Sequence, residues 1–332
     1  MTVNWIHRPT LKPGRSIELL FSSIKPYLVK HISIREFTLP GIGDLNRDAS
    51  RQHKFLKQLP PSDLTHILGD VHYVAPWIKD KQVHTFHDLE SLLQGNYIRK
   101  YLKKRLWLYN ALKYSESVSV ISQHTNSTIL DLYPKQKDKV QVIPNPLLFQ
   151  PYTDAIQKQK QDNFVQFLSI GTKANKNIEG IAVAISKYNK NYCWHIVGKL
   201  TPEQTSYLNS LNLNFQSHVN LSEKDLSRLY KSSDLLLFPS FYEGFGIPII
   251  EAQAHGLPVI TSNVTAMPEV AGDAALLVNP YNSDEILQAI EKLEDLEIRK
   301  SLIEKGYKNI KKYSLEQVAK QYINWYKQVL NA

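Results

Sequence analysis

The sequence predicts an α/β protein built from two doubly wound, Rossmann-like domains. Three observations point to this fold class. The chain has 332 residues, about twice the length of a typical domain. Short runs of β-branched and aromatic residues alternate with longer amphipathic segments, as in βαβ units around a parallel sheet. A polar segment with three prolines, 144–163, separates two such series and predicts a linker.

Each series supplies six candidate strands, and helical segments lie between them. The strand candidates are short runs bounded by turn-forming residues. They lie at 3–8, 32–39, 65–69, 83–86, 117–122 and 140–144, and then at 164–171, 193–198, 215–219, 234–239, 258–262 and 274–278. Apolar residues spaced three or four apart predict helices. They lie at 16–29, 97–114, 123–132, 177–188, 202–210, 223–231, 246–255, 283–295, 297–312 and 315–330.

This order of elements predicts the domain organisation. We expect a first domain over 1–150, a second over 151–312, and a C-terminal helix at 313–332 that packs back toward the first domain. Two such domains facing each other would enclose a cleft lined by the carboxyl ends of their strands. Open α/β sheets bind ligands there, so a nucleotide-type ligand is the first hypothesis.

Composition restricts the compartment and the class of site. Cys193 is the single cysteine, which excludes an intramolecular disulfide and a cysteine-based zinc site. The start of the chain lacks an apolar stretch of signal-peptide length, and no run of about 18 apolar residues occurs. We therefore expect a cytoplasmic protein that spans no membrane.

Charge is distributed unequally between the two halves. Residues 1–150 hold 21 Lys and Arg against 12 Asp and Glu, whereas residues 151–332 hold 19 of each. A basic first domain suits phosphates, an anionic membrane face or nucleic acid, and it also serves solubility. Composition alone does not choose among these.

Several well-known site motifs do not occur in the sequence. It contains no phosphate loop of the type G-x-x-x-x-G-K-[ST], no complete G-x-G-x-x-G after a strand, no H-E-x-x-H and no Asp-x-Asp pair. His84, His87 and Asp88 lie close together in the sequence. Alternation along a strand places positions three apart on opposite faces, so we expect no metal site.

The segment richest in candidate site residues is 239–280. It leaves the strand DLLLFP, passes through Glu243-Gly244-Phe245-Gly246 and enters a helix that carries Glu251. Glycines let a ligand approach the backbone, and free N–H groups at a helix start favour an anion such as a diphosphate. Carboxylates there suit sugar or ribose hydroxyls. The alternative is that Glu243 caps the helix and Glu251 is a solvated surface residue.

The stretch E-G-F-G-I-P-I-I-E resembles the E-x7-E signature of glycosyltransferase family four. These are retaining nucleotide-sugar transferases with the GT-B fold of two Rossmann-like domains. The resemblance covers about 83–295 and is strongest in the second domain. It continues through HTFHDL, VISQHTNSTILDLYP, VIPNP, SIGTKANKN, SEKDLSRLYKSSDLLLFPS, GLPVITS and MPEVAGDAALLVNP.

The resemblance implies roles for residues of the second domain. Glu243 would hold hydroxyls of the donor sugar, and Glu251 would hold the ribose of its nucleotide. The backbone at Gly244, Phe245 and Gly246 would lie beside the sugar and diphosphate. Lys176 would bind the diphosphate. The family often has an arginine a few positions earlier, where this chain offers Gly171, Thr172 and Lys173.

In the first domain the same resemblance marks three residues. His87 of FHDL matches a histidine near the reacting sugar, and its alternative is a structural histidine. Gly14 lies where relatives have a glycine-rich loop near the diphosphate. Asn145 of IPNP matches an asparagine near the domain crossover.

The implied reaction moves a hexosyl unit from a nucleotide-diphosphate sugar to a glycan or lipid-linked acceptor bound by the first domain, as in bacterial surface polysaccharide synthesis. The enzyme would use no cofactor and no metal. The leaving phosphate would help to take the acceptor proton, so no protein nucleophile is expected. The alternatives are a nucleotide-sugar epimerase or phosphorylase of the same fold, or a basic nucleic-acid-binding module. The first half shows no nucleic-acid recognition motif, so we expect no nucleic-acid partner.

The predicted helix 97–114 carries much of the basic excess. Ile98, Leu102, Leu106, Tyr109 and Leu112 follow helical spacing and predict a stripe that faces the core. Its other side would present Arg99, Lys100, Lys103 and Lys104. That side is either a solvated face or a peripheral contact with an anionic membrane.

Overall fold

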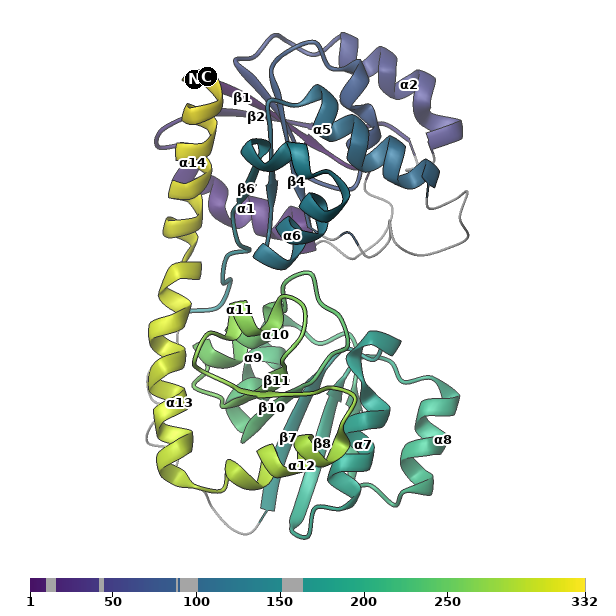
Figure 1. The fold of residues 1–332 in the computed structure, drawn as a ribbon, viewed down its shortest axis with the longest axis vertical. Helices are drawn as coiled ribbons and strands as arrows, with labels where there is room; N and C mark the ends of the chain where they lie inside the picture. Colours follow the sequence, from purple (N-terminus) through teal and green to yellow (C-terminus); the bar gives the residue numbers. More distant parts are fainter. Residues whose placement is uncertain (10–15, 42–44, 88, 90–100, 151–163, 332) are drawn as a thin grey trace. The chain divides into compact units, whose positions relative to one another are not determined.

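The computed structural model describes residues 1–9, 16–41, 45–87, 89, 101–150 and 164–331. The chain divides into two compact units. Unit 1 consists of Met1–Pro146 and Ser314–Ala332, and unit 2 of Leu147–Tyr313. In the described residues each unit holds one sheet of six parallel strands flanked by helices (Figure 1). The predicted α/β class with two doubly wound sheets is confirmed.

The sheet of unit 1 has the strand order β2-β1-β3-β4-β5-β6. Its strands are β1 Thr2–His7, β2 Ser33–Thr38, β3 Leu64–Ile67, β4 Gln82–Phe86, β5 Ser117–Val120 and β6 Val140–Val142. The helices of the unit are α1 Ser16–Leu28, α2 Leu45–Lys57, α6 Gln123–Leu132 and α14 Leu315–Asn331, with shorter turns at His72–Trp77 and Pro134–Lys139. The order in which strands are added to the sheet reverses between β1 and β3, which makes this the switch point of the sheet.

Strand β1 shows why the sheet of unit 1 is buried on both faces. Val3 and Trp5 point to the face covered by α1 and α14, where they pack with Phe21 and Tyr326. Ile6 points to the other face, toward the cluster that includes Tyr73. This alternation follows from the two-residue period of a strand. The C-terminal helix α14 thus completes the core of unit 1, beside α1 (Figure 1).

Buried histidines form hydrogen bonds inside unit 1. His66 Nδ1 lies 2.6 Å from Tyr326 Oη, and its Nε2 lies 2.8 Å from Thr85 Oγ1. His72 Nδ1 lies 3.1 Å from His84 Nδ1. Burial lowers the pKa of His66 and His72 well below the ordinary value and lowers the pKa of His84 to about 3, so all three are neutral at pH 7.

The sheet of unit 2 has the order β12-β11-β10-β7-β8-β9. Its strands are β7 Phe164–Ile170, β8 Asn191–Val197, β9 Phe215–His218, β10 Leu235–Phe238, β11 Val259–Ser262 and β12 Leu276–Val278. Counted within the unit, this is the Rossmann order 3-2-1-4-5-6. Its switch point lies between the neighbouring strands β7 and β10.

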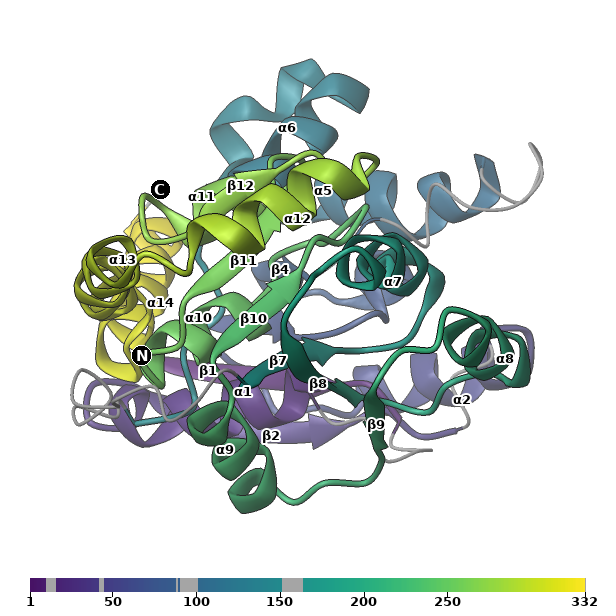
Figure 2. The same ribbon diagram turned by 90° about the horizontal axis from the view of Figure 1, so that it is seen from below.

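Helices cover both faces of this second sheet. They are α7 Ile178–Ser186, α8 Pro202–Ser210, α9 Glu223–Ser232, α10 Ile247–Ala254, α11 Met267–Ala271, α12 Ser283–Lys292 and α13 Leu296–Asn309. Figure 2 shows α7 and α12 together on one face and α9 and α10 on the other. The loops after β7 and β10 therefore open at the carboxyl edge of the sheet, between two layers of helices.

Helix α2 was not predicted from the sequence. Over 47–57, where its side chains are described, the buried positions are Asp48, Gln52 and Leu56, which share one helical face, and two of the three are polar. Gln52 donates to the Pro40 carbonyl at 3.1 Å and accepts from the Tyr73 hydroxyl at 2.9 Å. A buried face made of hydrogen-bonded polar groups gives no apolar periodicity, so a search based on periodicity misses it.

The core-facing stripe predicted for 97–114 is confirmed at Leu106 and Leu112 but wrong at Leu102 and Tyr109. Leu102 and Tyr109 are 49% and 39% exposed, whereas Leu108 and Ala111 are fully buried. The reason is a π-helical segment at Lys104–Tyr109, followed by α5 at Asn110–Tyr114. Hydrogen bonds from i to i+5 widen the turn and rotate the buried face away from the 3.6-residue period. Ile98, Arg99 and Lys100 lie outside the described residues.

Candidate active site

The switch point of unit 2 brings together two of the predicted site residues. Lys176 follows β7 and Glu243 follows the neighbouring strand β10. Lys176 Nζ lies 2.6 Å from Glu243 Oε1, and the two side chains are 17% and 13% exposed. Lys176 Nζ also lies 4.6 Å from the centre of the Phe238 ring. A close ion pair therefore stands where an open α/β sheet binds ligands.

Two asparagines fix the loops that carry this pair. Asn177, which is buried, donates through Nδ2 to the Pro239 carbonyl at 3.0 Å and the Pro280 carbonyl at 2.7 Å. Its Oδ1 accepts from the Gly180 N–H and so caps α7. Asn175 donates to the Tyr242 carbonyl at 2.9 Å. The loops after β7, β10 and β12 are thus joined into one cluster.

Neither asparagine was proposed as a site residue from the sequence. The available signal was the Asn that immediately precedes the helix in SIGTKANKN, since asparagine is a favoured N-cap. Asn177 has φ 56°, a left-handed conformation that asparagine tolerates better than most residues. The sequence does not show that the same side chain also reaches two other loops.

Glycines occur where the backbone of the cluster requires them. Gly171 has φ 95°, and a Cβ atom added to it would lie 2.8 Å from Cε of Lys176. Gly246 has φ 99° and immediately precedes α10. Both positions favour glycine because other residues rarely adopt these angles. Any larger residue at Gly171 would displace the Lys176 side chain.

Glu251 lies on α10 and is neither a cap nor a solvated surface residue. Its Oε2 accepts a hydrogen bond from the Tyr230 hydroxyl at 2.8 Å. Burial, with a smaller contribution from the negative charge of Glu223, raises the pKa of Glu251 to about 7, against the opposing effect of the Tyr230 hydroxyl. The Tyr230 ring stacks on His255 with centroids 5.0 Å apart. Glu251 is therefore poised between its neutral and ionised forms near pH 7.

The remaining predicted residues of unit 2 lie around these loops. The Phe245 side chain is 4% exposed and packs edge-on against Tyr313, so only its backbone can serve a ligand. Gly244 lies between Glu243 and Phe245. Thr172 donates to the Lys199 carbonyl at 2.8 Å, and the Lys173 side chain is exposed. Both line an open hollow of about 530 Å³ together with Ala174, Glu179, Thr201, Glu203 and Gln204.

In unit 1 the structure brings His87 and Asn145 together. His87 follows β4, and its Nε2 donates to the Leu68 carbonyl at 3.1 Å. Burial lowers its pKa to about 4, and a hydrogen bond with the Asn145 side chain opposes this shift. His87 is therefore a neutral imidazole at pH 7. Gly14 lies outside the described residues.

A charged group at the carboxyl end of β1 was not proposed from the sequence. Arg8 follows β1 and donates through Nε to Glu18 Oε1 at 2.8 Å. Its Nη1 lies 3.3 Å from Asp70 Oδ2. The sequence shows an arginine at the end of the first strand. It does not show the two partners of this arginine, which come from α1 and from the loop after β3. Only the fold brings them together.

The histidines near β4 do not form a metal site with one another. His84 contacts His72 and the Gln82 side chain, whereas His87 contacts the Leu68 carbonyl. Asp88 lies outside the described residues. Among the residues that the structure describes, no group of three His, Cys, Asp or Glu side chains could hold a metal ion.

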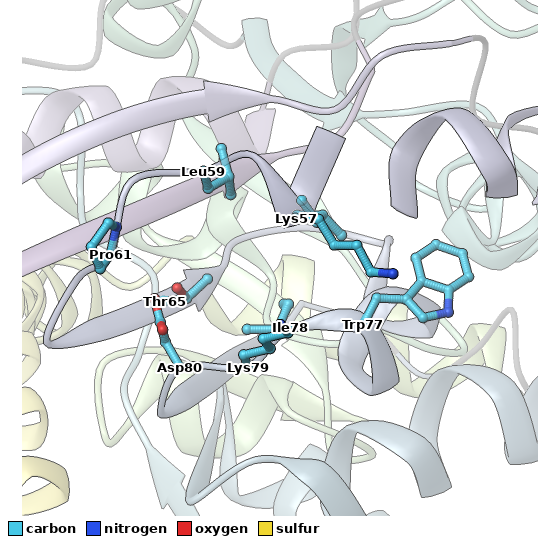
Figure 3. A pocket seen from close by; sticks show the side chains of 9 residues that line it. Lys57, Leu59, Pro61, Thr65, Trp77, Ile78, Lys79 and Asp80 are labelled. Carbon is cyan, nitrogen blue, oxygen red and sulfur yellow. The ribbon is translucent and has the colours of Figure 1, made fainter. Parts of the chain in front are cut away.

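Unit 1 also contains a small pocket away from the predicted site. It measures about 120 Å³ and is lined by Lys57, Trp77 and Asp80 among others (Figure 3). Thr65, near the start of β3, forms part of its wall. The pocket therefore lies toward the amino end of that strand, opposite to the edge where His87 lies.

Comparison with known proteins identifies the family. Residues 152–309 match the family described as glycosyl transferases group 1. The matched segment contains both Lys176 and Glu243. The names of similar sequences also indicate a glycosyltransferase. The chain is a glycosyltransferase, and residues 152–309 are its group 1 domain.

Two relatives of this glycosyltransferase are named for their reaction. The O-antigen chain mannosyltransferase B of Escherichia coli is 29% identical over 296 residues, which cover 79% of this chain and 74% of the relative. The O-antigen chain mannosyltransferase RfbU of Salmonella typhimurium is 27% identical over 266 residues, which cover 76% and 71%.

A solved structure shares the fold over nearly the whole glycosyltransferase. Anabaena HepE, in complex with UDP and glucose, superposes with a TM-score of 0.78 at 18% sequence identity, covering 99% of this chain and 100% of HepE. The GT-B architecture expected from the sequence is thereby confirmed. In the part of the chain that the structure describes, no helix is both long and apolar enough to cross a bilayer.

Proposed function

We propose that this glycosyltransferase transfers mannose from a nucleotide-diphosphate sugar to a glycan or lipid-linked acceptor, with retention of configuration. The observation that carries the proposal is the Lys176–Glu243 pair at the switch point of unit 2. Lysine binds phosphate as a point charge, and a carboxylate accepts hydrogen bonds from sugar hydroxyls. The names of the two O-antigen mannosyltransferases support mannose and surface polysaccharide. The UDP bound to HepE supports a nucleotide donor.

The pair suggests how the donor would be held. Lys176 Nζ and Glu243 Oε1 form an ion pair at 2.6 Å. A diphosphate that binds Lys176 and the N-terminus of α7 would release Glu243, which could then accept from hydroxyls of the sugar. The charge that develops on the leaving diphosphate would be stabilised by groups already in place. Glu251 would hold the ribose of the same donor.

The proposed mechanism uses neither a metal nor a protein nucleophile. Lys176 and helix N-termini supply the positive charge, and the leaving phosphate helps to take the acceptor proton. His87, neutral with its Nε2–H donated to the Leu68 carbonyl, would lie near the reacting sugar as a hydrogen-bonding group. EDTA should leave transfer largely unchanged. Complete loss of activity that added cations restore would contradict this part of the proposal.

We also propose that the enzyme works on the cytoplasmic face of a membrane. Tyr101 and Leu102 are 55% and 49% exposed beside Lys103 and Lys104. Basic side chains are worth about 1 kcal/mol each at an anionic surface, and exposed aromatic residues suit the interface.

Liposome flotation tests the membrane contact. Binding should require anionic lipid and weaken as salt rises. Replacing Arg99, Lys100, Lys103 and Lys104 with glutamine should abolish it, whereas replacing the three lysines of α13 should not. Unchanged flotation of the first variant would show that this helix is not the membrane contact.

A panel of nucleotide sugars tests the donor proposal. Binding of one member should raise the melting temperature, because a ligand that binds only the folded state stabilises it. We expect GDP-mannose to give the largest shift and to act as donor for a lipid-linked acceptor. If another sugar nucleotide gave the largest shift instead, the transferred sugar would be that of this nucleotide and not mannose. No stabilisation by any member, with no transfer, would contradict a donor site in unit 2.

A further inference from the structure

The loop after β12 presents an aromatic ring to solvent beside the proposed donor site. Tyr281 is 75% exposed, the highest value among the large hydrophobic residues that the structure describes. Its ring stacks on Phe241 with centroids 4.9 Å apart and planes at 25°. Two rings in this arrangement form a flat apolar surface with one face protected and the other open.

The backbone hydrogen bonds of the site hold this ring pair in place. Phe241 lies two residues before Glu243, and its N–H donates to the Asn175 carbonyl at 2.8 Å. Tyr281 follows Pro280, whose carbonyl accepts from Asn177 at 2.7 Å. Both rings therefore belong to the loop cluster that holds the Lys176–Glu243 pair. The ring pair is not an isolated surface feature.

The loop that carries Tyr281 is itself well ordered by local contacts. The Tyr281 N–H donates to Asn279 Oδ1 at 3.0 Å. The next residue, Asn282, caps α12 by accepting from the Asp284 and Glu285 N–H groups. A tyrosine on a fixed backbone has two side-chain torsions to restrict, so binding through it costs little conformational entropy.

An exposed ring of this kind is poorly explained by folding. A side chain with a role in the core would be buried. The exposed part of the Tyr281 ring contributes no hydrophobic free energy to folding, because only apolar surface removed from water does so. The ring carries no charge, so it does not suit the diphosphate, which Lys176 serves. A flat apolar face with a hydroxyl at its edge matches a pyranose ring, whose C–H groups lie on its faces and whose hydroxyl groups lie around its rim.

We propose that Tyr281, supported by Phe241, is a binding platform for a sugar ring of the acceptor glycan. This inference rests on the proposed function, because it takes the neighbouring Lys176–Glu243 pair to hold the donor. It assigns an acceptor contact to unit 2, in addition to the acceptor binding that the family resemblance implies for the first domain. The platform would hold the glycan next to the donor sugar by stacking, and its contribution would be to acceptor affinity.

The test uses the full-length chain and two ligands. The probes are a linear α-linked mannotriose, followed by ligand-observed NMR, and GDP, followed by calorimetry. The variants are Tyr281→Ala, which removes the ring, and Tyr281→Phe, which keeps it. Leu296→Ala is the matched control, because Leu296 is also an exposed apolar residue of unit 2, at 64%.

We expect Tyr281→Ala to weaken mannotriose binding about tenfold, the effect typical of removing an aromatic anchor. Tyr281→Phe and Leu296→Ala should bind within about twofold of the wild type, and all four proteins should bind GDP equally.

If the wild type binds GDP but not mannotriose, or if Tyr281→Ala binds mannotriose normally, the platform is refuted. Weaker GDP binding by Tyr281→Ala would assign the ring to the nucleotide and would also refute it. Mannotriose binding through Tyr281 without any nucleotide binding would keep the platform and refute the donor site.

Discussion

The two sheets share one architecture but treat their polar residues differently. In unit 2 the polar groups assigned to the site are charged and follow the strand ends, with Lys176 and Glu243 2.6 Å apart and partly exposed. In unit 1 the histidines His66 and His84 are fully buried within the strands and are neutral. Charge that must meet a ligand stays accessible, whereas neutral groups can be buried when they are hydrogen-bonded.

Because of this difference, we expect changes in the two units to affect different properties of the protein. Changes at the strand ends of unit 2 should alter donor binding and transfer while leaving the fold intact. Changes in protonation within unit 1 should alter stability first.

Replacing Glu243 should give the largest change. Glu243→Gln keeps the shape of the side chain but loses the charge that pairs with Lys176 and accepts from the sugar. We expect transfer to fall about 10²-fold or more, the usual result of losing a charged group that stabilises the transition state, with the melting temperature nearly unchanged. Steady-state kinetics and thermal unfolding measure both. Glu291→Gln on the exposed side of α12 is the control, and near-normal turnover of Glu243→Gln would exclude the assigned role.

Acid should destabilise unit 1. The pKa of buried His84 is about 3 in the folded chain, below the value of about 6.5 for an unfolded histidine. Its contribution to stability is therefore fully present above pH ~6.5 and is lost as pH falls toward 3. Between pH 6.5 and 5 this amounts to about 2 kcal/mol, and His66 and His72 act in the same direction.

Thermal unfolding across this pH range measures the effect. His84→Gln should unfold with a shallower pH dependence than the wild type, whatever its stability at pH 7. His31→Gln, at an exposed position, should keep the wild-type slope. Equal slopes in all three proteins would show that the buried histidines do not set the acid response.

The sequence predicts the strands of this fold better than its helices. Most strands are short runs of apolar or β-branched residues with a turn at the end, so the pattern locates them. The pattern does not predict helix α2, because the polar residues Asp48 and Gln52 occupy its buried face. At 101–114 part of the predicted buried face is wrong, because a π-helical turn at Lys104–Tyr109 changes the helical period on which the prediction depends.

For the site, the sequence locates the residues but not all their partners. Glu243 and Lys176 stand in recognisable motifs directly after strands, and parallel neighbouring strands bring them together. The contacts of Glu251 with Tyr230, and of Asn177 with Pro280, join residues 21 and 103 positions apart. Such contacts depend on helix packing and loop conformation, which no local pattern encodes.

The ionisation of Glu251 should make donor binding depend on pH. Its pKa is about 7, and the carboxylate accepts ribose hydroxyls better than the neutral acid does. Affinity for GDP-mannose, whose diphosphate is esterified at both ends, should rise several-fold and at most about tenfold between pH 6 and 8.

Two variants sharpen this prediction. Glu251→Gln should remove the pH dependence. Glu223→Gln should move the midpoint to lower pH, because the charge of Glu223 raises the pKa of Glu251. A Glu251→Gln protein that keeps both the affinity and the pH dependence of the wild type would show that Glu251 does not contact the donor.

The central claim is that the Lys176–Glu243 pair is the diphosphate and sugar site. Calorimetric titration of GDP and UDP into the wild type, Lys176→Ala and Lys173→Ala tests it most directly, because Lys173 is an exposed lysine on the same loop. We expect the preferred nucleotide to bind Lys176→Ala about tenfold or more weakly than the wild type, and Lys173→Ala nearly normally. Equal affinity of the wild type and Lys176→Ala, with weakened binding by Lys173→Ala, would contradict it.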